Sequence, residues 1–196
     1  MQPIQTAFFS GTFNPVHTGH LILASYLCEY EGFDEVWISV TPQNPLREKL
    51  SPEADRQRIE MLRLAVTGNP KIVATDVEFS LPLPSYTIRT LDHLRSRYPD
   101  REFTLVIGAD NWLLFDRWYE SRRIVDEYHV CIYPRRGYEI DETKLPPTVR
   151  YCRAPLIEIS STQVRAGIAA GKNMNYFVPQ SVYNYIIKHG LYKNNE

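Results

Sequence analysis

The 196-residue sequence contains few cysteines and no long hydrophobic run, and both absences narrow the choice of protein class. Its three cysteines, Cys28, Cys131 and Cys152, are far apart and form no C-x-x-C pair, which argues against a disulfide framework and a cysteine-based zinc site. No segment approaches the roughly 18 apolar residues of a membrane helix, and no basic stretch typical of a signal peptide opens the chain. We therefore expect a cytoplasmic protein with no membrane association and no metal site of its own.

Basic residues are absent from the first part of the chain. The formal net charge is −1, and no lysine or arginine precedes Arg47. Nucleic-acid-binding proteins normally carry a basic excess, so we expect no nucleic-acid partner. An anion bound by the first 46 residues must be held by backbone amides and imidazoles. The length fits a single domain, residues 1–196, which can bury a core without disulfide or metal support.

Short apolar segments alternate with amphipathic ones along the chain. This alternation predicts an α/β fold: a Rossmann-like, doubly wound parallel sheet with helices on both faces and a small C-terminal helical part. Ligands of such sheets bind outside the carboxyl ends of the strands, so the loops that follow the strands should converge on one cleft. Strands are expected at 6–10, 34–41, 71–75, 103–108, 128–133 and 150–152, and helices at 21–28, 56–65, 86–98, 161–170 and 180–189.

The segment from Gly11 to His20, Gly-Thr-Phe-Asn-Pro-Val-His-Thr-Gly-His, joins the first predicted strand to the first predicted helix. Such a loop gathers free backbone N–H groups and the positive end of a helix dipole, which together suit a phosphate. His17 and His20 can both point at a bound group, and Thr18 is expected to cap the helix. A lone histidine is more often a surface or core residue, but two of them flanking Gly19 favour a binding role.

A second segment, Ile159-Ser-Ser-Thr-Gln-Val-Arg165, opens a later predicted helix with hydroxyl side chains. The hydroxyls of Ser160, Ser161 and Thr162 can cap exposed amides, and amides at a helix start also bind phosphate. Arg165, about one turn into the helix, could place its forked guanidinium on phosphate oxygens. Taken alone, the segment fits an ordinary cap with an exposed arginine equally well.

Two further segments contain groups that suit either a core or a ligand site. Ser85-Tyr86-Thr87 follows a proline and precedes a predicted helix, where serine and threonine are common caps. Gly108-Ala109-Asp110 ends a predicted strand, and Trp118 and Tyr119 follow eight and nine residues after Asp110. A tryptophan near a helix end is more often part of a core than a ligand platform, so neither segment alone predicts binding.

In combination these segments resemble a known superfamily. The first is similar to the HxGH motif of the nucleotidyltransferases, which include nucleotide adenylyltransferases and class I aminoacyl-tRNA synthetases, and the segment ending at Arg165 is similar to the ISSTxxR motif of the adenylyltransferases. The chain lacks the KMSKS loop and anticodon-binding domain of the synthetases. The Ser-Tyr-Thr segment and the G-x-D…W-Y spacing narrow the resemblance to the bacterial nicotinate-nucleotide adenylyltransferases, from Gly11 to Arg165.

This resemblance implies transfer of the adenylyl group of ATP to nicotinate mononucleotide, which forms nicotinate adenine dinucleotide and pyrophosphate in NAD biosynthesis. It implies ATP and nicotinate mononucleotide as partners, with Mg²⁺ bound mainly by the phosphates of ATP. Two alternatives remain open. A phosphopantetheine adenylyltransferase shares the first two motifs, although it lacks the Ser-Tyr-Thr segment. A non-catalytic nucleotide sensor could retain the fold, although loss of a histidine or of Arg165 would then be expected.

The resemblance also assigns roles to individual residues. It makes His17, His20 and Arg165 the catalytic set. ATP and its phosphates would contact Gly11, Thr12, Phe13, Gly19, Arg135, Ser160, Ser161 and Thr162. The mononucleotide would contact Arg47, Lys49, Ser85, Tyr86, Thr87, Gly108, Asp110, Trp118 and Tyr119, with Trp118 expected to stack on the cationic pyridine ring.

Three positions depart from the family pattern. Asn14 stands where the family usually has aspartate, and the turn Arg135-Arg136-Gly137 lacks the family's proline. The family's Pro-Pro-His-Lys is replaced by residues 44–49, which leaves open whether Arg47 or Lys49 supplies the cation. The sequence also leaves open the preference between nicotinate and nicotinamide and the oligomeric state, including a homo-oligomer.

Overall fold

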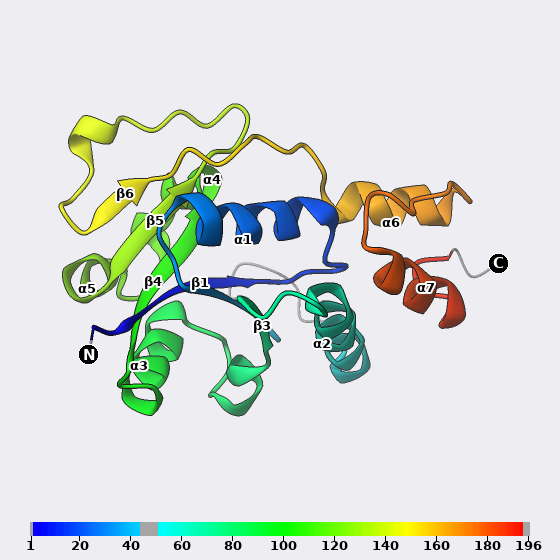
Figure 1. Ribbon diagram of the computed structural model, residues 1–196, viewed down its shortest axis with the longest axis horizontal. Helices are drawn as coiled ribbons and strands as arrows, with labels where there is room; N and C mark the ends of the chain where they lie inside the picture. Colours follow the sequence, from blue (N-terminus) through cyan, green and yellow to red (C-terminus); the bar gives the residue numbers. More distant parts are fainter. Residues whose placement is uncertain (1, 44–50, 194–196) are drawn as a thin grey trace.

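A six-stranded, fully parallel sheet forms the centre of the protein (Figure 1) in a computed structural model that describes residues 2–43 and 51–193. The strand order is β3-β2-β1-β4-β5-β6. The order therefore reverses between β1 and β4, the two neighbouring strands at the centre of the sheet. Such a reversal creates a crevice at the carboxyl ends of the two strands, where ligands bind. The strands are β1 (Ile4–Gly11), β2 (Glu35–Val40), β3 (Ile72–Thr75), β4 (Arg101–Gly108), β5 (His129–Tyr133) and β6 (Val149–Tyr151).

The predicted fold class is confirmed, and each predicted strand and helix overlaps an observed one, with ends that differ by at most four residues. The structure adds two short helices, α4 and α5, between β4 and β5, where the sequence indicates none. The helices are α1 (Thr18–Tyr30), α2 (Pro52–Val66), α3 (Thr87–Arg97), α4 (Ala109–Trp112), α5 (Ser121–Glu127), α6 (Ser161–Ala169) and α7 (Gln180–Lys188), with 3₁₀ turns η1 (Val77–Ser80), η2 (Phe115–Arg117) and η3 (Glu142–Lys144).

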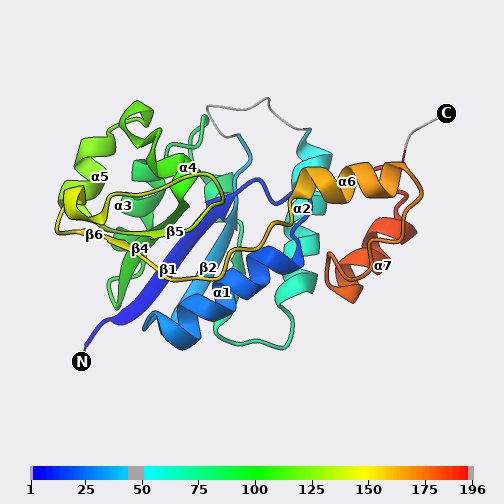
Figure 2. The same cartoon turned by 90° about the horizontal axis from the view of Figure 1, so that it is seen from above.

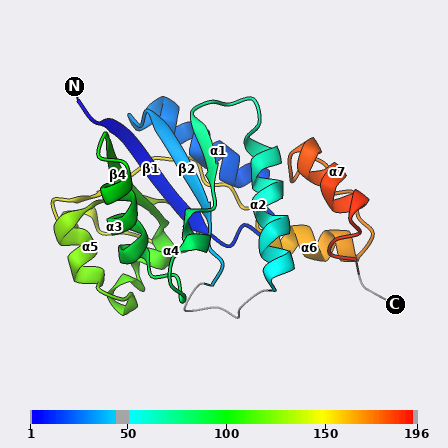
Figure 3. The same ribbon diagram turned by 90° about the horizontal axis from the view of Figure 1, so that it is seen from below.

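Both faces of the sheet are buried under helices, which explains why the strands are continuous apolar runs. Phe9 of β1 points into a core shared with α1 and α2, whereas its neighbour Phe8 points into a core shared with α3 and α5. Phe8 lies opposite Trp37 of β2 and Leu105 of β4, so the second core continues across three strands. Helices α1 and α3 lie on opposite sides of β1 (Figures 1 and 3).

Helices α6 and α7 form the C-terminal helical part, beyond the carboxyl end of β1 (Figures 1 and 2). Val182 and Ile186 of α7 are fully buried in the core that α1 and α2 share, and Ser181 Oγ donates a hydrogen bond to the carbonyl of Leu64 in α2 (3.0 Å). This packing brings the start of α6 close to the loop after β1. Over residues 2–43 and 51–193, no helix has the length and apolar character needed to cross a bilayer.

Candidate active site

The loop after β1 enters α1 through His17, and the predicted helix cap at Thr18 is wrong. His17 has an extended backbone (φ −136°, ψ 167°) and directly precedes the helix, whereas Thr18 is its first helical residue. The Thr18 N–H donates to the carbonyl of Phe177 (2.9 Å), and its hydroxyl donates to the carbonyl of Tyr176 (3.3 Å). Thr18 therefore ties the loop to the segment before α7, which the local sequence could not reveal.

The two imidazoles of this loop stack on each other at the end of β1. Their ring centroids are 3.5 Å apart with an interplanar angle of 20°. The backbone N–H of His17 donates a hydrogen bond to His20 Nδ1 (3.1 Å). The proton of a neutral His20 ring is therefore on Nε2, which remains a donor. A Cβ on residue 19 would lie 3.1 Å from His17 Nδ1, so the absence of a side chain at Gly19 leaves room for the His17 ring. Both histidines line a cavity at the carboxyl end of β1.

Burial keeps these imidazoles neutral. Desolvation lowers the pKa of His17 to about 4, and the positive charge of Arg135 acts in the same direction. Desolvation also lowers the pKa of His20 well below 6.5, with smaller contributions from His17 and Arg135. At neutral pH the histidines can therefore offer N–H hydrogen bonds to a phosphate, while the positive charge at the cavity comes from arginines.

The lowered pKa of His17 should make the protein less stable in acid. At pH 5 the unfolded chain binds a proton at His17 and the folded chain does not, so stability is full above pH 6.5 and falls toward pH 4. We expect the free energy of unfolding to drop by about 2 kcal/mol between pH 7 and pH 5 through this group. Urea titrations at the two pH values, on the unsubstituted protein and on His17→Gln, measure this difference; an equal pH dependence in both would contradict it.

The start of α6 docks onto the loop after β1, so two of the predicted motifs meet. Ser161 Oγ donates to the carbonyl of Pro15 (2.8 Å), and Arg165 Nη1 donates to the carbonyl of Asn14 (2.7 Å). Ser160 caps α6 by accepting a hydrogen bond from the Gln163 N–H (3.1 Å). The two contacts to the loop thus place the capped end of α6 and the Arg165 guanidinium at the cavity that contains the two histidines.

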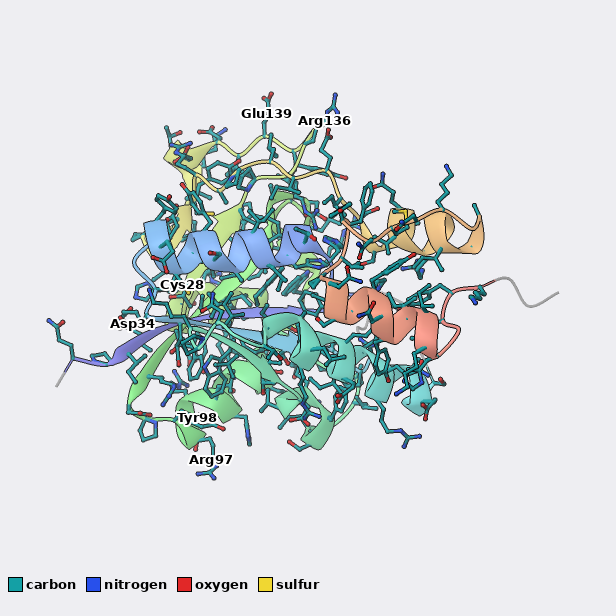
Figure 4. The ribbon with its side chains drawn as sticks, turned by 45° about the vertical axis from the view of Figure 1, so that its right-hand side comes forward. Cys28, Asp34, Arg97, Tyr98, Arg136 and Glu139 are labelled. Atoms are coloured by element: carbon teal, nitrogen blue, oxygen red, sulfur yellow. The ribbon has the colours of Figure 1, made fainter. Side chains whose placement is uncertain are left out.

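Asn14 and the turn at residues 135–137 depart from the family pattern, and hydrogen bonds hold both of them; residues 44–49, the third departure, lie outside the described residues. Asn14 Oδ1 accepts a hydrogen bond from the Tyr192 hydroxyl (2.6 Å). The neutral asparagine makes this contact without the negative charge that an aspartate would bring to the cavity. Gly137 has φ +81°, and the Arg135 carbonyl accepts a hydrogen bond from the Tyr138 N–H (3.1 Å), so the turn closes without proline. Arg136 projects away from the body of the protein (Figure 4) and pairs with Glu158 at 2.8 Å.

The side chain of Phe13 is part of the core. It is 4% exposed and packs edge-on against Phe9, with ring centroids 5.2 Å apart, and a Cβ on Gly11 would lie 3.2 Å from its ring. Gly11, Thr12 and Phe13 all line the cavity at the end of β1. Because the ring of Phe13 is packed in the core, we expect a ligand to contact the backbone of this residue more than its ring.

Arg58 is a buried residue of this region that the sequence analysis missed. It is 1% exposed, and Nη1 donates to the carbonyls of Thr12 (2.5 Å) and Thr41 (3.1 Å). It also pairs with Asp55 one turn earlier in α2 (2.5 Å). Arg58 therefore fixes the loop after β1 to the end of β2. Its position on the apolar face of α2, beside Met61 and Leu62, was the available signal.

Glu78 is a second buried group that the sequence analysis missed. Its carboxyl is 3% exposed and accepts hydrogen bonds from the hydroxyls of Ser10 (2.5 Å) and Thr41 (3.5 Å). Burial raises the pKa of Glu78, and the hydroxyl hydrogen bonds act against that rise. The side chain joins η1 to the carboxyl ends of β1 and β2. A single glutamate between Val77 and Phe79 carries no sequence pattern that would mark it.

Three adjoining cavities along the carboxyl edge of the sheet share lining residues. The central cavity lies between the loop 11–14, the two histidines and the segment 159–165, and Gly108 and Arg135 also line it. The α3 cavity is lined by Ser85, Tyr86, Thr87, Trp118 and Tyr119, and it shares Gly11, Asn111 and Trp118 with the central cavity. The β5 cavity is lined by Gly19, Asp110, Tyr138 and Leu156, and it shares the histidines, Arg135 and Ser160.

In the α3 cavity the aromatic side chains already contact one another. The rings of Tyr86 and Tyr119 lie 4.5 Å apart, and Trp118 packs on Phe115 at 5.3 Å. Ser85 Oγ and Trp118 Nε1 are buried and have no hydrogen-bond partner within the described chain, as expected for groups that meet a ligand. Trp37 is buried in the core against Phe103 and Tyr98, as its place in a strand predicts.

Gly108 and Asp110 form a close contact with Arg135. Asp110 Oδ1 lies 3.5 Å from Arg135 Nε, an ion pair without hydrogen-bond geometry. A Cβ on residue 108 would lie 2.3 Å from this oxygen, so a larger residue there would displace the Asp110 carboxylate. The expected convergence is therefore observed for the described candidate residues. Arg47 and Lys49 lie outside the described residues, and the choice between them stays a prediction, as do the ligand roles of all the candidates.

Known proteins are similar in sequence to this chain over nearly its full length. Residues 8–167 match the family model described as "Cytidylyltransferase-like". The chain is 50% identical over 188 residues to a Bacteroides fragilis protein named "Probable nicotinate-nucleotide adenylyltransferase", covering 96% of this chain and 94% of that protein. A Flavobacterium johnsoniae protein of the same name is 40% identical over 192 residues, covering 97% of this chain and 100% of that protein.

Solved structures of low sequence identity share the fold. The Plasmodium falciparum nicotinic acid mononucleotide adenylyltransferase complexed with NaAD superposes with a TM-score of 0.79 at 21% identity, covering 97% of this chain and 98% of that one. A structure described as "The Crystal Structure of a Putative Nicotinate-nucleotide Adenylyltransferase from Vibrio parahaemolyticus" gives a TM-score of 0.69 at 21% identity, covering 100% of this chain and 98% of that one.

Proposed function

The chain belongs to the cytidylyltransferase-like family and, within it, to the nicotinate-nucleotide adenylyltransferases, and from this premise we propose its reaction. It transfers the adenylyl group of ATP to the phosphate of nicotinate mononucleotide, which gives nicotinate adenine dinucleotide and pyrophosphate. This reaction is a step of NAD biosynthesis. The observation that carries the proposal is the run of three connected cavities with neutral imidazoles and arginines at its middle.

Two nucleotides that react through their phosphates fit this arrangement. Aromatic rings line the α3 cavity and suit a pyridine ring, while Tyr138 and Leu156 offer apolar walls for a nucleobase in the β5 cavity. The phosphates of both would then meet in the central cavity, beside His17, His20 and Arg165. Holding both reactants in this order supplies the proximity that a reaction between two anions requires.

The chemistry we propose is a direct in-line displacement. A phosphate oxygen of the mononucleotide attacks the α-phosphorus of ATP, the new P–O bond forms, and the bond to the β-phosphate oxygen breaks. Pyrophosphate leaves with the electron pair. The attacking oxygen is already ionised at neutral pH, so no general base is needed. The imidazole N–H groups, Arg135 and Arg165 would stabilise the charge that develops on the phosphates.

Magnesium enters this proposal as part of the ATP substrate. Among the described residues that line the central cavity, hydroxyl, amide, imidazole and guanidinium groups occur, and carboxylates do not. Mg²⁺ prefers oxygen ligands and keeps several waters when phosphates hold it. The donor set therefore does not fit a resident magnesium ion, and the phosphates of ATP would bring the ion.

Pyrophosphate release tests the proposed reaction. The protein is supplied with ATP and, separately, with nicotinate mononucleotide, nicotinamide mononucleotide or phosphopantetheine, and the dinucleotide product is identified by mass. We expect release with nicotinate mononucleotide and none with phosphopantetheine. Binding of ATP without release for any mononucleotide would contradict the proposal and favour a nucleotide sensor.

Trp118→Ala should weaken mononucleotide binding selectively. Trp118 lines the α3 cavity with its indole N–H unpartnered in the described chain, so its loss removes a wall of that cavity. We expect the KM for nicotinate mononucleotide to rise about tenfold and the KM for ATP to change little. Trp112→Ala is the matched control, because Trp112 stacks on the same Phe115 from outside the described lining of the α3 cavity. Equal losses for both substrates would make Trp118 a packing residue.

We further propose that residues 1–196 act as one nucleotidyltransferase domain. Elements from both ends of the chain support this, because α7 packs on α2 and α6 docks on the loop after β1. The cytoplasmic location and a homo-oligomeric assembly stay predictions.

A further inference from the structure

Two arginines stand at the α3 cavity without a carboxylate partner in the part of the chain that the structure describes. Arg117 of η2 belongs to the lining of this cavity. The guanidinium carbon of Arg89 in α3 lies 4.9 Å from the ring centroid of Tyr86 and 5.6 Å from that of Tyr119, and both rings line the same cavity. Two aromatic faces therefore hold one cation at its rim while a second cation contributes to its wall.

Two arginines on the neighbouring surface are paired with carboxylates. Arg95, further along α3, pairs with Glu127 at 3.0 Å, and Arg123 of α5 pairs with Asp92 at 2.9 Å and with Glu127 at 2.7 Å. Among the described residues, Arg97 and Arg122 also lack a carboxylate partner, but neither lines the α3 cavity, whereas Arg117 lines it and Arg89 lies against two of its rings.

The α3 cavity has little negative charge to offset these two arginines. Among the described residues that line it, Glu78 is the one with a carboxyl group. That group is buried, accepts hydrogen bonds from Ser10 and Thr41, and has a pKa raised by burial. The cavity therefore favours an anionic ligand group over a neutral one.

The mononucleotides of nicotinate and nicotinamide differ at one group, a carboxylate in the first and a neutral carboxamide in the second. We propose that Arg89 and Arg117 are specificity-determining residues that make this chain prefer the acid mononucleotide over the amide. The inference rests on the proposed function and adds to it the residues that select the substrate. Near the protein surface, each charge should contribute about fivefold to the preference.

The test compares kcat/KM for nicotinate mononucleotide with kcat/KM for nicotinamide mononucleotide, both measured by pyrophosphate release. The variants are Arg89→Gln, Arg117→Gln, the double variant and the charge-conserving Arg89→Lys. Arg97→Gln is the matched control. Arg97 lies eight residues further along α3, about 12 Å away along the helix, is exposed, and has its guanidinium carbon 5.9 Å from the ring of Tyr98. Its side chain points away from the body of the protein (Figure 4).

We expect the acid-to-amide ratio to fall about fivefold in each single glutamine variant and about 25-fold in the double variant. Arg89→Lys and Arg97→Gln should keep the ratio of the unsubstituted enzyme. Added salt should lower that ratio, because it screens the two charges.

An unchanged ratio in the double variant would overturn the proposal. So would an equal fall in kcat/KM for both mononucleotides in Arg89→Gln, because Arg89 would then only support the Tyr86–Tyr119 pair. Failure of the proposed function would look different: the unsubstituted enzyme would release no pyrophosphate with either mononucleotide, and both proposals would fall.

Discussion

His20→Ala should lower kcat by roughly 10²–10³-fold, the size of effect seen when a fixed hydrogen-bond donor to a transition state is removed. The backbone N–H of His17 donates a hydrogen bond to Nδ1 of His20. The edge-on ring of Phe13, whose centroid lies 4.8 Å from that of His20, helps to fix the imidazole plane. The Nε2–H is therefore held in place before substrate binds. Its lowered pKa keeps the ring neutral, so the loss is that of an oriented donor rather than that of a positive charge.

Steady-state pyrophosphate release measures this effect. His189→Ala is the control, because this exposed histidine directly follows α7, and its ring lies 4.2 Å from that of Tyr185, outside the described lining of the three cavities. We expect His189→Ala to keep normal turnover and His20→Gln, which retains an N–H donor, to recover part of the loss. A normal rate in His20→Ala would remove His20 from the chemistry.

Arg58→Met should lower the free energy of unfolding by about 3–5 kcal/mol, since the change leaves a partly buried carboxylate without its partner. The carbonyls of Thr12 and Thr41 would lose their donors as well, and burial makes each such loss costly. We also expect kcat to fall, because Arg58 fixes the loop that leads to the two histidines. Arg58→Lys keeps the charge but cannot reach both carbonyls with a planar fork, so it should recover only part of each loss.

Urea titration of Arg58→Met and Arg56→Met compares the free energy of unfolding lost on removing a buried arginine with that lost on removing an exposed one. Arg56 lies in the same helix and pairs with Glu53 at 2.6 Å, but both side chains are more than half exposed (71% and 61%). Exposed pairs contribute about 1 kcal/mol or less, so Arg56→Met should change stability little. An equal decrease in the free energy of unfolding in the two variants would show that the burial of Arg58 adds nothing to its contribution to stability.

The strands and the long helices could be predicted because their burial is periodic in the sequence. The buried runs of β1 and β4 are continuous since helices cover both faces of the sheet, and α1 and α3 repeat their apolar residues at helical spacing. The short helices α4 and α5 escaped prediction, because four and seven residues are too few to show a helical period.

The candidate site could be predicted only where a motif carries its chemistry locally. His17 and His20 lie within one turn of each other, and the hydroxyls before Arg165 cap their own helix, so their residue types already indicate phosphate binding. Thr18 and Arg58 could not be assigned in this way. The partner atoms of Thr18 are the Phe177 and Tyr176 carbonyls, and those of Arg58 are the Thr12 and Thr41 carbonyls, far away in the sequence.

By itself, the sequence determined the α/β class, the parallel sheet and the set of polar loops that follow its strands, because apolar periodicity and turn residues are local properties of the chain. Only the tertiary structure decided which of those loops touch. Arg165 reaches the carbonyl of Asn14 across 151 residues, and Glu78 reaches Ser10 across 68. Such contacts depend on the order of strands in the sheet and on helix packing against it, and they exist only once the core has brought distant segments together.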